Sequence, residues 1–332
     1  LHPILHSFPT RRSSDLPTSA GIHLGNYFGA VRQWIALQEK NDAYYFIATY
    51  HAMTSLKDPS DLRKNQLEVA LDYLALGLNP EKSTVYLQQD IPEVTELSWI
   101  LSTLTPMGTL ERCHAYKDKV AKGLSADHAL FAYPVLMAAD ILIVKSEGVP
   151  VGQDQKQHVE VTRDIAMKFN QAFGEVFPLP EPLILEGAGA KVPGIDGQKM
   201  SKSYGNDIRI FDPEKKVRKQ VMAIVTDTSG VDEAKEPDGN TIFELYQLCA
   251  NPEQVEVMAD KFRAENIGYG YGHAKQELFE ALMDEFGPAR KRREELAANI
   301  GDVEEILRAG AAKVRPVVEE TMAAVRQATG LR

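Results

Sequence analysis

The chain has 332 residues, of which 44% are hydrophobic and 25% charged, and its formal net charge is −10 at pH 7. This length permits two domains, and the acidic balance argues against a protein that coats nucleic acid regardless of sequence, although a local basic patch can still bind RNA. No apolar run approaches the roughly 20 residues that span a bilayer. Cys113 and Cys249 lie far apart without CxxC spacing, so neither disulfides nor a protein-bound metal site is expected, and a reducing cytoplasm is the predicted compartment.

The first residues are unusual in composition. His6 to Leu16, HSFPTRRSSDL, is identical to a one-frame translation of a common sequencing adapter. It lacks the apolar core of a signal peptide and a clean amphipathic period. We therefore interpret residues 1–16 as a non-native segment that arose during sequence assembly.

A turn and a helix are predicted next. Residues 17–26, PTSAGIHLGN, favour a tight turn that brings polar side chains and backbone N–H groups to an anion at a helix N-terminus, and helical spacing continues to Lys40. His23 alone is more typical of an ordinary surface histidine.

Strands and helices then alternate. Residues 43–49 predict a buried strand, 62–76 an amphipathic helix with Ser60 as its N-cap and Gly77 at its end, and 84–87 another strand. A helix is expected over 93–104. This rhythm indicates a parallel α/β sheet, in which ligands collect at the carboxyl ends of the strands.

The long apolar helix predicted over residues 125–144 contains one anomaly, Asp140. Carboxylates are rarely buried without a partner. Tyr133, Met137 and Asp140 follow i, i+4, i+7 spacing and so share one face. Either Asp140 pairs with a buried basic residue, or this face is a flat apolar slot with one acceptor at its end, which suits an indole ring.

A strand over 149–151 ends at Gly152, and Gln153, Asp154 and Gln155 open a helix that runs to Phe173. Asp154 suits a helix cap as well as a ligand role. A further strand is predicted at 183–185, and the Gly-rich residues 188–198 lead into the loop QKMSKSYGN at 198–206. Two lysines among hydroxyl residues suit a polyphosphate that is released afterwards, although such a loop by itself is usually solvated surface.

Beyond residue 206 the pattern changes to helices with charged faces. They are predicted at 214–225, 241–250, 252–263, 273–293 and 302–327, and we place a domain boundary near Asp207. The basic run Arg290 to Arg293 is typical of a solvated helix face and is also a candidate contact for nucleic acid.

Together, HLGN at 23–26 and KMSKS at 199–203 resemble the HIGH-like and KMSKS elements of class I aminoacyl-tRNA synthetases. The stretches Tyr116–Lys119, Tyr133–Leu142 and Val149–His158 look like those of bacterial-type tryptophanyl-tRNA synthetases. The resemblance extends from Pro17 to the C-terminus and is most specific between Tyr133 and Asp164.

This resemblance implies a Rossmann-like α/β catalytic domain over residues 17–206 and an all-helical, anticodon-binding domain over 207–332. It implies activation of L-tryptophan with ATP and Mg²⁺, and transfer of tryptophan to tRNA(Trp). A cytoplasmic homodimer is expected, with neither a membrane nor DNA as a partner.

The resemblance also implies roles for single residues. The catalytic groups would be His23, Asn26, Lys119, Lys199, Ser201 and Lys202. The ATP site would comprise Gly25, Asn26, Gly152, Gln153, Asp154, Val192, Lys199, Met200, Ser201, Lys202 and Ser203. The tryptophan site would comprise Tyr133, Met137, Asp140 and Gln155.

The family carries its first strand and a Gly-x-Gln turn where residues 6–16 stand here. The chain is therefore expected to lack its native first strand, and Leu16 stands where the family places a glutamine that contacts substrate.

Two alternatives stay open. Tyrosyl-tRNA synthetases share the fold and both loops, but the MAAD segment that contains Asp140 matches the tryptophan branch. A noncatalytic relative that binds nucleotide or tryptophan is the other alternative, against which the intact Lys199 and Lys202 argue.

Overall fold

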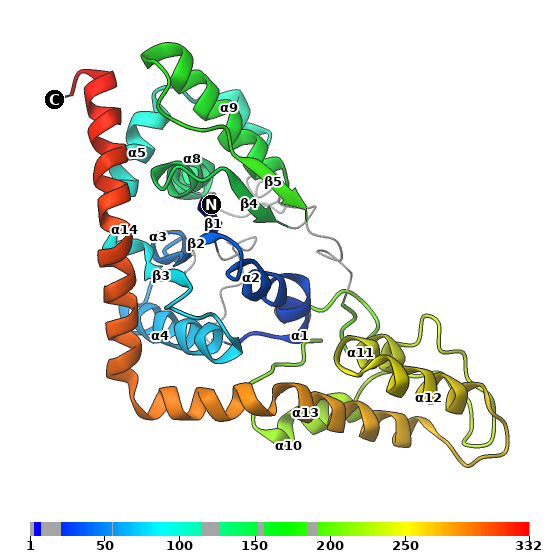
Figure 1. Ribbon diagram of the computed structural model, residues 1–332. Helices are drawn as coiled ribbons and strands as arrows, with labels where there is room; N and C mark the ends of the chain where they lie inside the picture. The colour runs from blue at the N-terminus through cyan, green and yellow to red at the C-terminus, as the bar shows by residue number, and fades with distance from the viewer. Residues whose placement is uncertain are drawn as a thin grey trace.

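A computed structural model describes residues 3–7, 21–54, 56–113, 127–151, 156–184 and 192–331. In this part of the chain, parallel strands form one sheet in the order β3-β2-β1-β4-β5 (Figure 1). The strands are β1 (Pro3–Ser7), β2 (Asp42–Ile47), β3 (Ser83–Leu87), β4 (Gly148–Val151) and β5 (Glu181–Ile184). The order reverses between β1 and β4, which is where doubly wound sheets bind ligands. The predicted Rossmann-like fold is confirmed.

The native first strand is expected to be missing, but the structure has a strand, β1, in the central place of the sheet. Pro3–Ser7 lies in the middle of the sheet and pairs in parallel with β2, from Pro3 opposite Asp42 to Ser7 opposite Phe46. Its other edge meets β4, with Ile4 opposite Gly148. A strand is joined to its neighbours through backbone N–H and C=O groups, so a segment of unrelated sequence can take this place.

Helices cover both faces of the sheet because successive side chains of a strand point to opposite faces. Tyr45 and Ile47 of β2 pack in one hydrophobic cluster with α2 (Arg32–Leu37) and α4 (Pro59–Leu76). Tyr44 and Phe46 pack in the other cluster, whose helices are α5 (Glu93–Ser102), α8 (His128–Ile143) and α9 (Lys156–Phe173).

Short elements complete this part of the molecule. The helix predicted from residue 25 to 40 consists of α1 (Leu24–Asn26), a π-helical turn η1 (Tyr27–Val31) and α2. The N-cap of α4 is Asp58, which accepts from Ser60 N at 2.7 Å, and not Ser60 as predicted; Gly77 ends the helix at φ 118°. The remaining short elements are α3 (Thr49–Ala52), η2 (Gln88–Asp90), α6 (Met107–Glu111) and η4 (Lys202–Tyr204).

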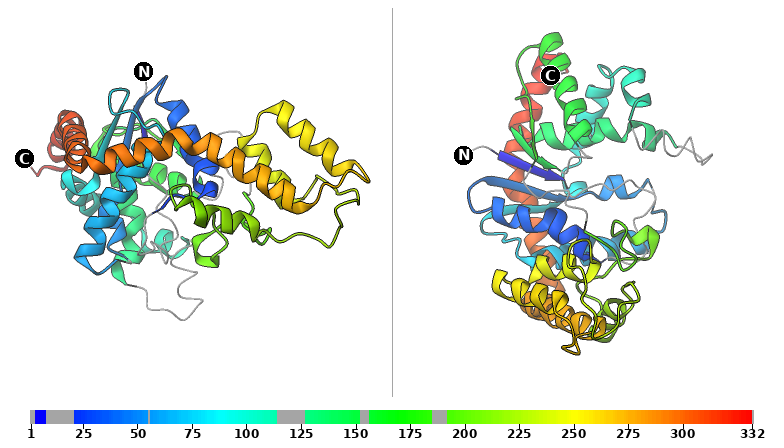
Figure 2. Two further views of the ribbon diagram at one scale, coloured as in Figure 1. Left: turned by 90° about the horizontal axis from the view of Figure 1, so that it is seen from below. Right: turned by 90° about the vertical axis from the view of Figure 1, so that its right-hand side faces the viewer.

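The five helices predicted after residue 206 are confirmed in type and order. They are α10 (Glu214–Met222), α11 (Thr241–Cys249), α12 (Pro252–Arg263), α13 (Tyr271–Ala298) and α14 (Ile300–Thr329). In Figure 2, α11, α12 and the first half of α13 extend away from the sheet.

The last helix returns to the sheet. Val314 and Val318 of α14 belong to the same buried cluster as Tyr86 of β3, and α14 runs along β3, the edge strand (Figure 1). At Gly310 the backbones approach so closely that a Cβ atom would lie 1.9 Å from the carbonyl oxygen of Val85. The helical part that follows residue 207 therefore does not form a separate core, because α14 packs with the strands.

Ion pairs also join the last two helices, α13 and α14, to helices that cover the sheet. Arg293 of α13 donates to Asp72 of α4 at 2.6 Å and also to Glu68. Arg315 of α14 contacts Glu93 of α5 at 2.6 Å. Within the basic run, Arg290 donates to two backbone carbonyls, those of residues 210 and 212. Arg290 and Arg293 therefore serve internal contacts, while Lys291 and Arg292 are exposed.

Candidate active site

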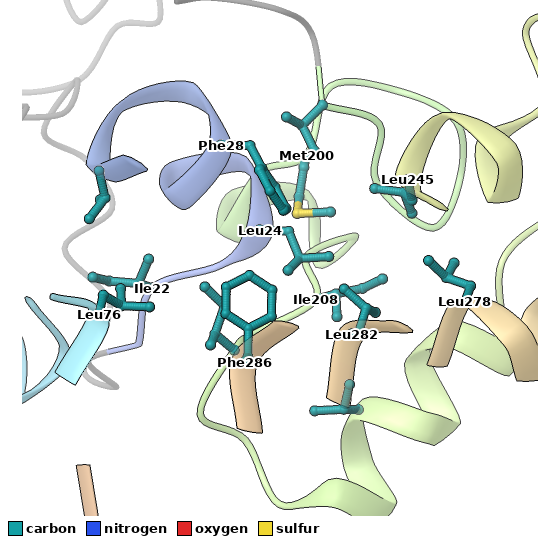
Figure 3. Close-up of a cluster of buried hydrophobic side chains, with 14 of the residues drawn as sticks. Ile22, Leu24, Phe28, Leu76, Met200, Ile208, Leu245, Leu278, Leu282 and Phe286 are labelled. Carbon is teal, nitrogen blue, oxygen red and sulfur yellow. The ribbon is translucent and has the colours of Figure 1, made fainter. Parts of the chain in front are cut away.

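The two predicted phosphate loops touch each other. The backbone N–H of Gly25 donates to the sulfur of Met200 at 3.4 Å. Leu24 N donates to the carbonyl of Ile208 at 3.0 Å, so the chain after the lysine loop pairs with the HLGN segment. Leu24, Met200 and Ile208 belong to one buried cluster (Figure 3). The family resemblance implied a shared ATP site, and the structure brings the two motifs into contact.

His23 is buried, with 4% of its surface exposed, so the alternative of an ordinary surface histidine is wrong. It caps α1: its Nδ1 accepts from Asn26 N at 3.2 Å, and Asn26 Oδ1 accepts from His23 N at 3.3 Å. These two bonds use acceptor atoms of both side chains. They therefore do not consume the donor groups that a phosphate would require.

The lysine loop is organised by one buried side chain, Asn206. Its Oδ1 accepts from Ser201 N at 2.8 Å, and its Nδ2 donates to Asp196 Oδ1 at 2.8 Å and to the carbonyl of Lys199 at 3.2 Å. Gly194 faces Asn206 so closely that a Cβ would lie 2.4 Å from Asn206 Cγ. The loop is thus held at its base.

Neither lysine of the loop is buried. Lys199 is exposed and Lys202, in η4, is half-buried. Ser201 caps η4 and shares a hydrogen bond of 2.8 Å with Ser203 between their hydroxyl oxygens. Cationic side chains on a base held by Asn206 and Met200 suit an anion that binds and leaves.

A second cluster lies at the carboxyl ends of β2 and β3. Asp140 of α8 is buried, at 2% exposure, and its Oδ2 accepts from His51 Nε2 at 2.9 Å. Gln88 Nε2 donates to both carboxylate oxygens, at 2.8 and 2.9 Å. Asp140 therefore does pair with a buried basic residue, His51, as the first of the two alternatives predicted. A carboxylate has about four lone-pair positions, so this pairing still leaves Asp140 able to accept from a ligand.

The electrostatics of Asp140 are set by opposing effects. Burial raises its pKa above the ordinary value, and the hydrogen bond and charge of His51 together with the hydrogen bond from Gln88 oppose this. Burial, and then the charge of Asp140, also raise the pKa of Tyr86. Donors around the carboxylate thus favour its charged, accepting form.

The other predicted tryptophan-site residues of α8 lie nearby. Met137 is buried, and the hydroxyl of Tyr133 lies 3.3 Å from His158 Nε2 of α9. The ring of Tyr133 makes an edge contact with the His51 ring, at 6.3 Å between centroids. Tyr133, Met137 and Asp140 therefore do share one side of α8, as their spacing predicted.

The remaining predicted residues divide into two groups. Val192 is buried and accepts, through its carbonyl, from Met200 N at 2.9 Å. Lys119, Gly152, Gln153, Asp154 and Gln155 lie outside the described residues. The strand β4 ends at Val151, directly before four of them, at the switch point of the sheet.

Sequence reasoning missed His51 and Gln88. Both follow directly after a buried strand, His51 in α3 after β2 and Gln88 in η2 after β3. That position at the carboxyl end of a parallel strand was the available signal. Within the residues that the structure describes, no group of three His, Cys, Asp or Glu side chains is arranged to hold a metal ion.

No helix in the described ranges is both long enough and apolar enough to cross a membrane. The site combines a cationic loop held at its base, a capped helix start and a buried acceptor beside apolar and aromatic side chains. Such a set can bind a polyphosphate and orient a ligand with one polar N–H, and it contains no activated nucleophile at these positions.

Comparison with known proteins agrees with this architecture. The family described as tRNA synthetases class I (W and Y) matches residues 13–287. A tryptophan–tRNA ligase of Rhodopirellula baltica is 54% identical over 319 residues, which cover 96% of this chain and 99% of the relative. One from Fusobacterium nucleatum is 52% identical over 322 residues, covering 97% of this chain and 98% of the relative.

Among solved structures, the Campylobacter jejuni tryptophanyl-tRNA synthetase in complex with ADP and tryptophan superposes with a TM-score of 0.91 at 45% identity, covering 99% of both chains. The fold, the two joined loops and these full-length similarities lead to one conclusion: the chain belongs to the class I tRNA synthetases of the tryptophan and tyrosine family.

Proposed function

We propose that this chain is a tryptophan–tRNA ligase that activates L-tryptophan with ATP to tryptophanyl-adenylate and then transfers tryptophan to tRNA(Trp). The observation that carries the proposal is the buried carboxylate of Asp140 beside Met137 and Tyr133 on α8. An indole ring has a single polar atom, an N–H donor, and Asp140 supplies the matching acceptor. The names of the Rhodopirellula and Fusobacterium relatives support the same reaction.

Selectivity follows from the cost of an unpaired buried acceptor. Phenylalanine has no N–H for Asp140, so its binding would leave the carboxylate without that bond. Tyrosine carries its hydroxyl along the ring axis, away from the position of the indole nitrogen. Gln155 would contact the α-amino group of the amino acid.

In the activation step, a carboxylate oxygen of tryptophan attacks the α-phosphorus of ATP in line. The new P–O bond forms as the bond to the pyrophosphate oxygen breaks, and neither a general base nor a covalent enzyme intermediate is required. Such a reaction is accelerated by positioning and by charge stabilisation. Lys199 and Lys202 would neutralise the departing pyrophosphate, with Lys119 assisting.

The other phosphate and nucleotide contacts come from both motifs. His23 and Asn26 would donate to phosphate oxygens, and Gly25 would allow the adenine to approach the backbone. Ser201, Ser203, Met200 and Val192 complete the lysine-loop side. Gly152, Gln153 and Asp154 would hold the nucleotide, with Gly152 and Asp154 at the ribose.

Mg²⁺ is proposed to enter with ATP and to share the charge of its phosphates. The described residues offer no cluster of three carboxylate, imidazole or thiolate ligands, which fits an ion held mainly by phosphate and water oxygens.

The helical part after residue 207 is proposed to bind the anticodon, and the enzyme to act as a cytoplasmic homodimer.

Two large apolar side chains, Trp99 of α5 and Met107 of α6, are 74% and 62% exposed in the single chain. We propose them as contacts of the second copy, which sedimentation analysis of Trp99→Ala would test.

Exchange of pyrophosphate into ATP tests the activation step. We expect exchange with tryptophan and background rates with tyrosine and phenylalanine, followed by charging of tRNA(Trp). Exchange driven by tyrosine would assign the chain to the tyrosine branch, and no exchange with any amino acid would favour a noncatalytic binder.

A further inference from the structure

One glutamine side chain ties the carboxyl ends of β2 and β3 together. Gln88, which follows β3, is 1% exposed. Its Oε1 accepts from the backbone N–H of Tyr50 in α3 at 2.9 Å. Its Nε2 donates to Asp140 Oδ1 and Oδ2 at 2.8 and 2.9 Å. Because a backbone N–H only donates and a carboxylate only accepts, the two partners together fix the orientation of the amide.

This arrangement makes the two oxygens of Asp140 unequal. Oδ2 accepts from both Gln88 and His51, the latter at 2.9 Å. Oδ1 accepts from Gln88 alone among the residues that the structure describes. Oδ1 is therefore the oxygen with the larger remaining capacity to accept a hydrogen bond from a ligand.

We propose that Gln88 is a positioning residue for amino-acid selection, which holds Asp140 as a carboxylate and presents Oδ1 to the indole N–H of tryptophan. This inference rests on the proposed function, in which Asp140 accepts that N–H. Gln88 acts through Asp140 and need not touch the substrate.

The donated N–H matters because the carboxylate is buried. Burial raises the pKa of Asp140, and Gln88 is one of the groups that oppose this shift. Without the donor, the neutral acid is favoured further, and a protonated carboxyl is a poorer acceptor. Substitutions at Gln88 should therefore make tryptophan recognition depend on pH.

Other titratable groups around Asp140 come from several elements. His51 lies on α3, Tyr86 on β3, and Tyr133 of α8 bonds to His158 of α9. On α5, which packs against α8, the carboxylates of Glu93 and Glu96 pair with Arg315 and Arg326 of α14. The substitutions below leave all of these groups in place.

Two substitutions at Gln88 predict opposite pH dependences. Gln88→Leu removes the donor, so the KM for tryptophan in pyrophosphate exchange should rise about tenfold, and the KM should fall again as rising pH ionises Asp140. Gln88→Glu keeps the shape and the acceptor for Tyr50 N–H. The introduced carboxyl donates to Asp140 only while the two carboxyl groups share one proton. The KM for tryptophan should therefore increase as the pH rises. In both variants kcat should change by less than about threefold, because the phosphate groups are untouched.

The matched control is Gln89→Leu. Gln89 is the next residue, is exposed, and its side chain accepts from Gln66 Nε2 at 3.1 Å without contacting Asp140. Its KM and pH profile should equal those of the wild type. Thermal melting shows whether each variant folds. If Gln88→Leu does not fold, the pH profile of Gln88→Glu tests the inference by itself.

Opposite pH slopes for the KM of the two variants would support the inference, since a merely structural defect does not invert with the substituent. Wild-type pH profiles in both folded variants would overturn it while leaving the proposed function intact. A wild-type enzyme that shows no tryptophan-dependent exchange would instead overturn the proposed function, and the role of Gln88 with it.

Discussion

The backbone N–H of Gly25 donates to the sulfur of Met200 at 3.4 Å and so joins two motifs that lie 175 residues apart. The sulfur atom is a weak acceptor, and its larger contribution is packing, because Met200 is 4% exposed in the cluster that contains Leu24. The contact makes the position of the lysine loop depend on the backbone of HLGN.

This contact predicts the effect of a methyl group at residue 25. In Gly25→Ala, the Cβ would lie 3.0 Å from the His23 ring and 3.3 Å from Met200 Cβ, so both motifs must shift. We expect the KM for ATP in pyrophosphate exchange to rise about tenfold or more, since misplacement of positioning groups is costly. Gly29→Ala is the control, because a Cβ at Gly29 meets nothing within 4 Å. Equal KM values in the two variants would contradict the coupling.

Asn206 makes a second prediction about the lysine loop. Asn206→Ala removes the bonds to Ser201 N, Asp196 and the Lys199 carbonyl. The free energy of unfolding should fall by about 1–3 kcal/mol, because buried groups lose their partners. The kcat of exchange should fall at the same time, because Lys199 and Lys202 lose their fixed base. Asn41→Ala, which removes one bond to the carbonyl of Leu37, serves as control and should leave kcat unchanged.

Asp72 predicts a pH dependence of stability. Burial raises its pKa from 3.8 to about 6, although Arg293 and the N–H of Ile22 oppose the shift. The folded state therefore holds the proton more tightly than the unfolded chain between about pH 4 and pH 6. The contribution of Asp72 to the free energy of unfolding is largest below pH 4 and is lost as the pH rises through 6.

Asp72→Asn removes this titration. The free energy of unfolding of the wild type minus that of the variant should increase by about 1 kcal/mol per pH unit as the pH falls from 6 to 4. Urea unfolding of the wild type and the variant at pH 4.5, 6.0 and 7.5 measures this difference. Asp164→Asn, at an exposed position, is the control. A difference that stays constant, or shrinks on acidification, would show that Asp72 does not titrate in this way.

The return of α14 to the sheet depends on the missing side chain of Gly310. In Gly310→Ala the Cβ would overlap the carbonyl oxygen of Val85, so the helix must move off β3. We expect a loss of about 3 kcal/mol or more of unfolding free energy, as for other overpacked sites. Gly301→Ala, in the same helix with nothing within 4 Å, should be neutral or slightly stabilising. Similar melting temperatures for the two variants would argue against the close contact.

Features with a local cause could be predicted from the sequence. The helices after residue 206 follow from periodicity and caps, and Asp140 stood out because a carboxylate in an apolar helix requires a partner. The contact between HLGN and KMSKS was expected only through the family resemblance.

Features that depend on distant partners could not be predicted. Pro3–Ser7 joins the sheet through backbone pairing, which leaves little trace in side-chain pattern. The amphipathic stripe of α14 shows that it packs but not that its partner is β3. His51 and Gln88 acquire their meaning only when the fold brings the ends of β2 and β3 to Asp140.

The central claim is that the buried carboxylate of Asp140 selects tryptophan. Tryptophan-dependent pyrophosphate exchange by Asp140→Ala tests it most directly, with Asp164→Ala on the exposed face of α9 as control. We predict that kcat/KM for tryptophan falls about a hundredfold or more in Asp140→Ala, because the indole N–H loses a charged acceptor, and that the control is unchanged. A folded Asp140→Ala variant that keeps the wild-type kcat/KM for tryptophan would contradict the account.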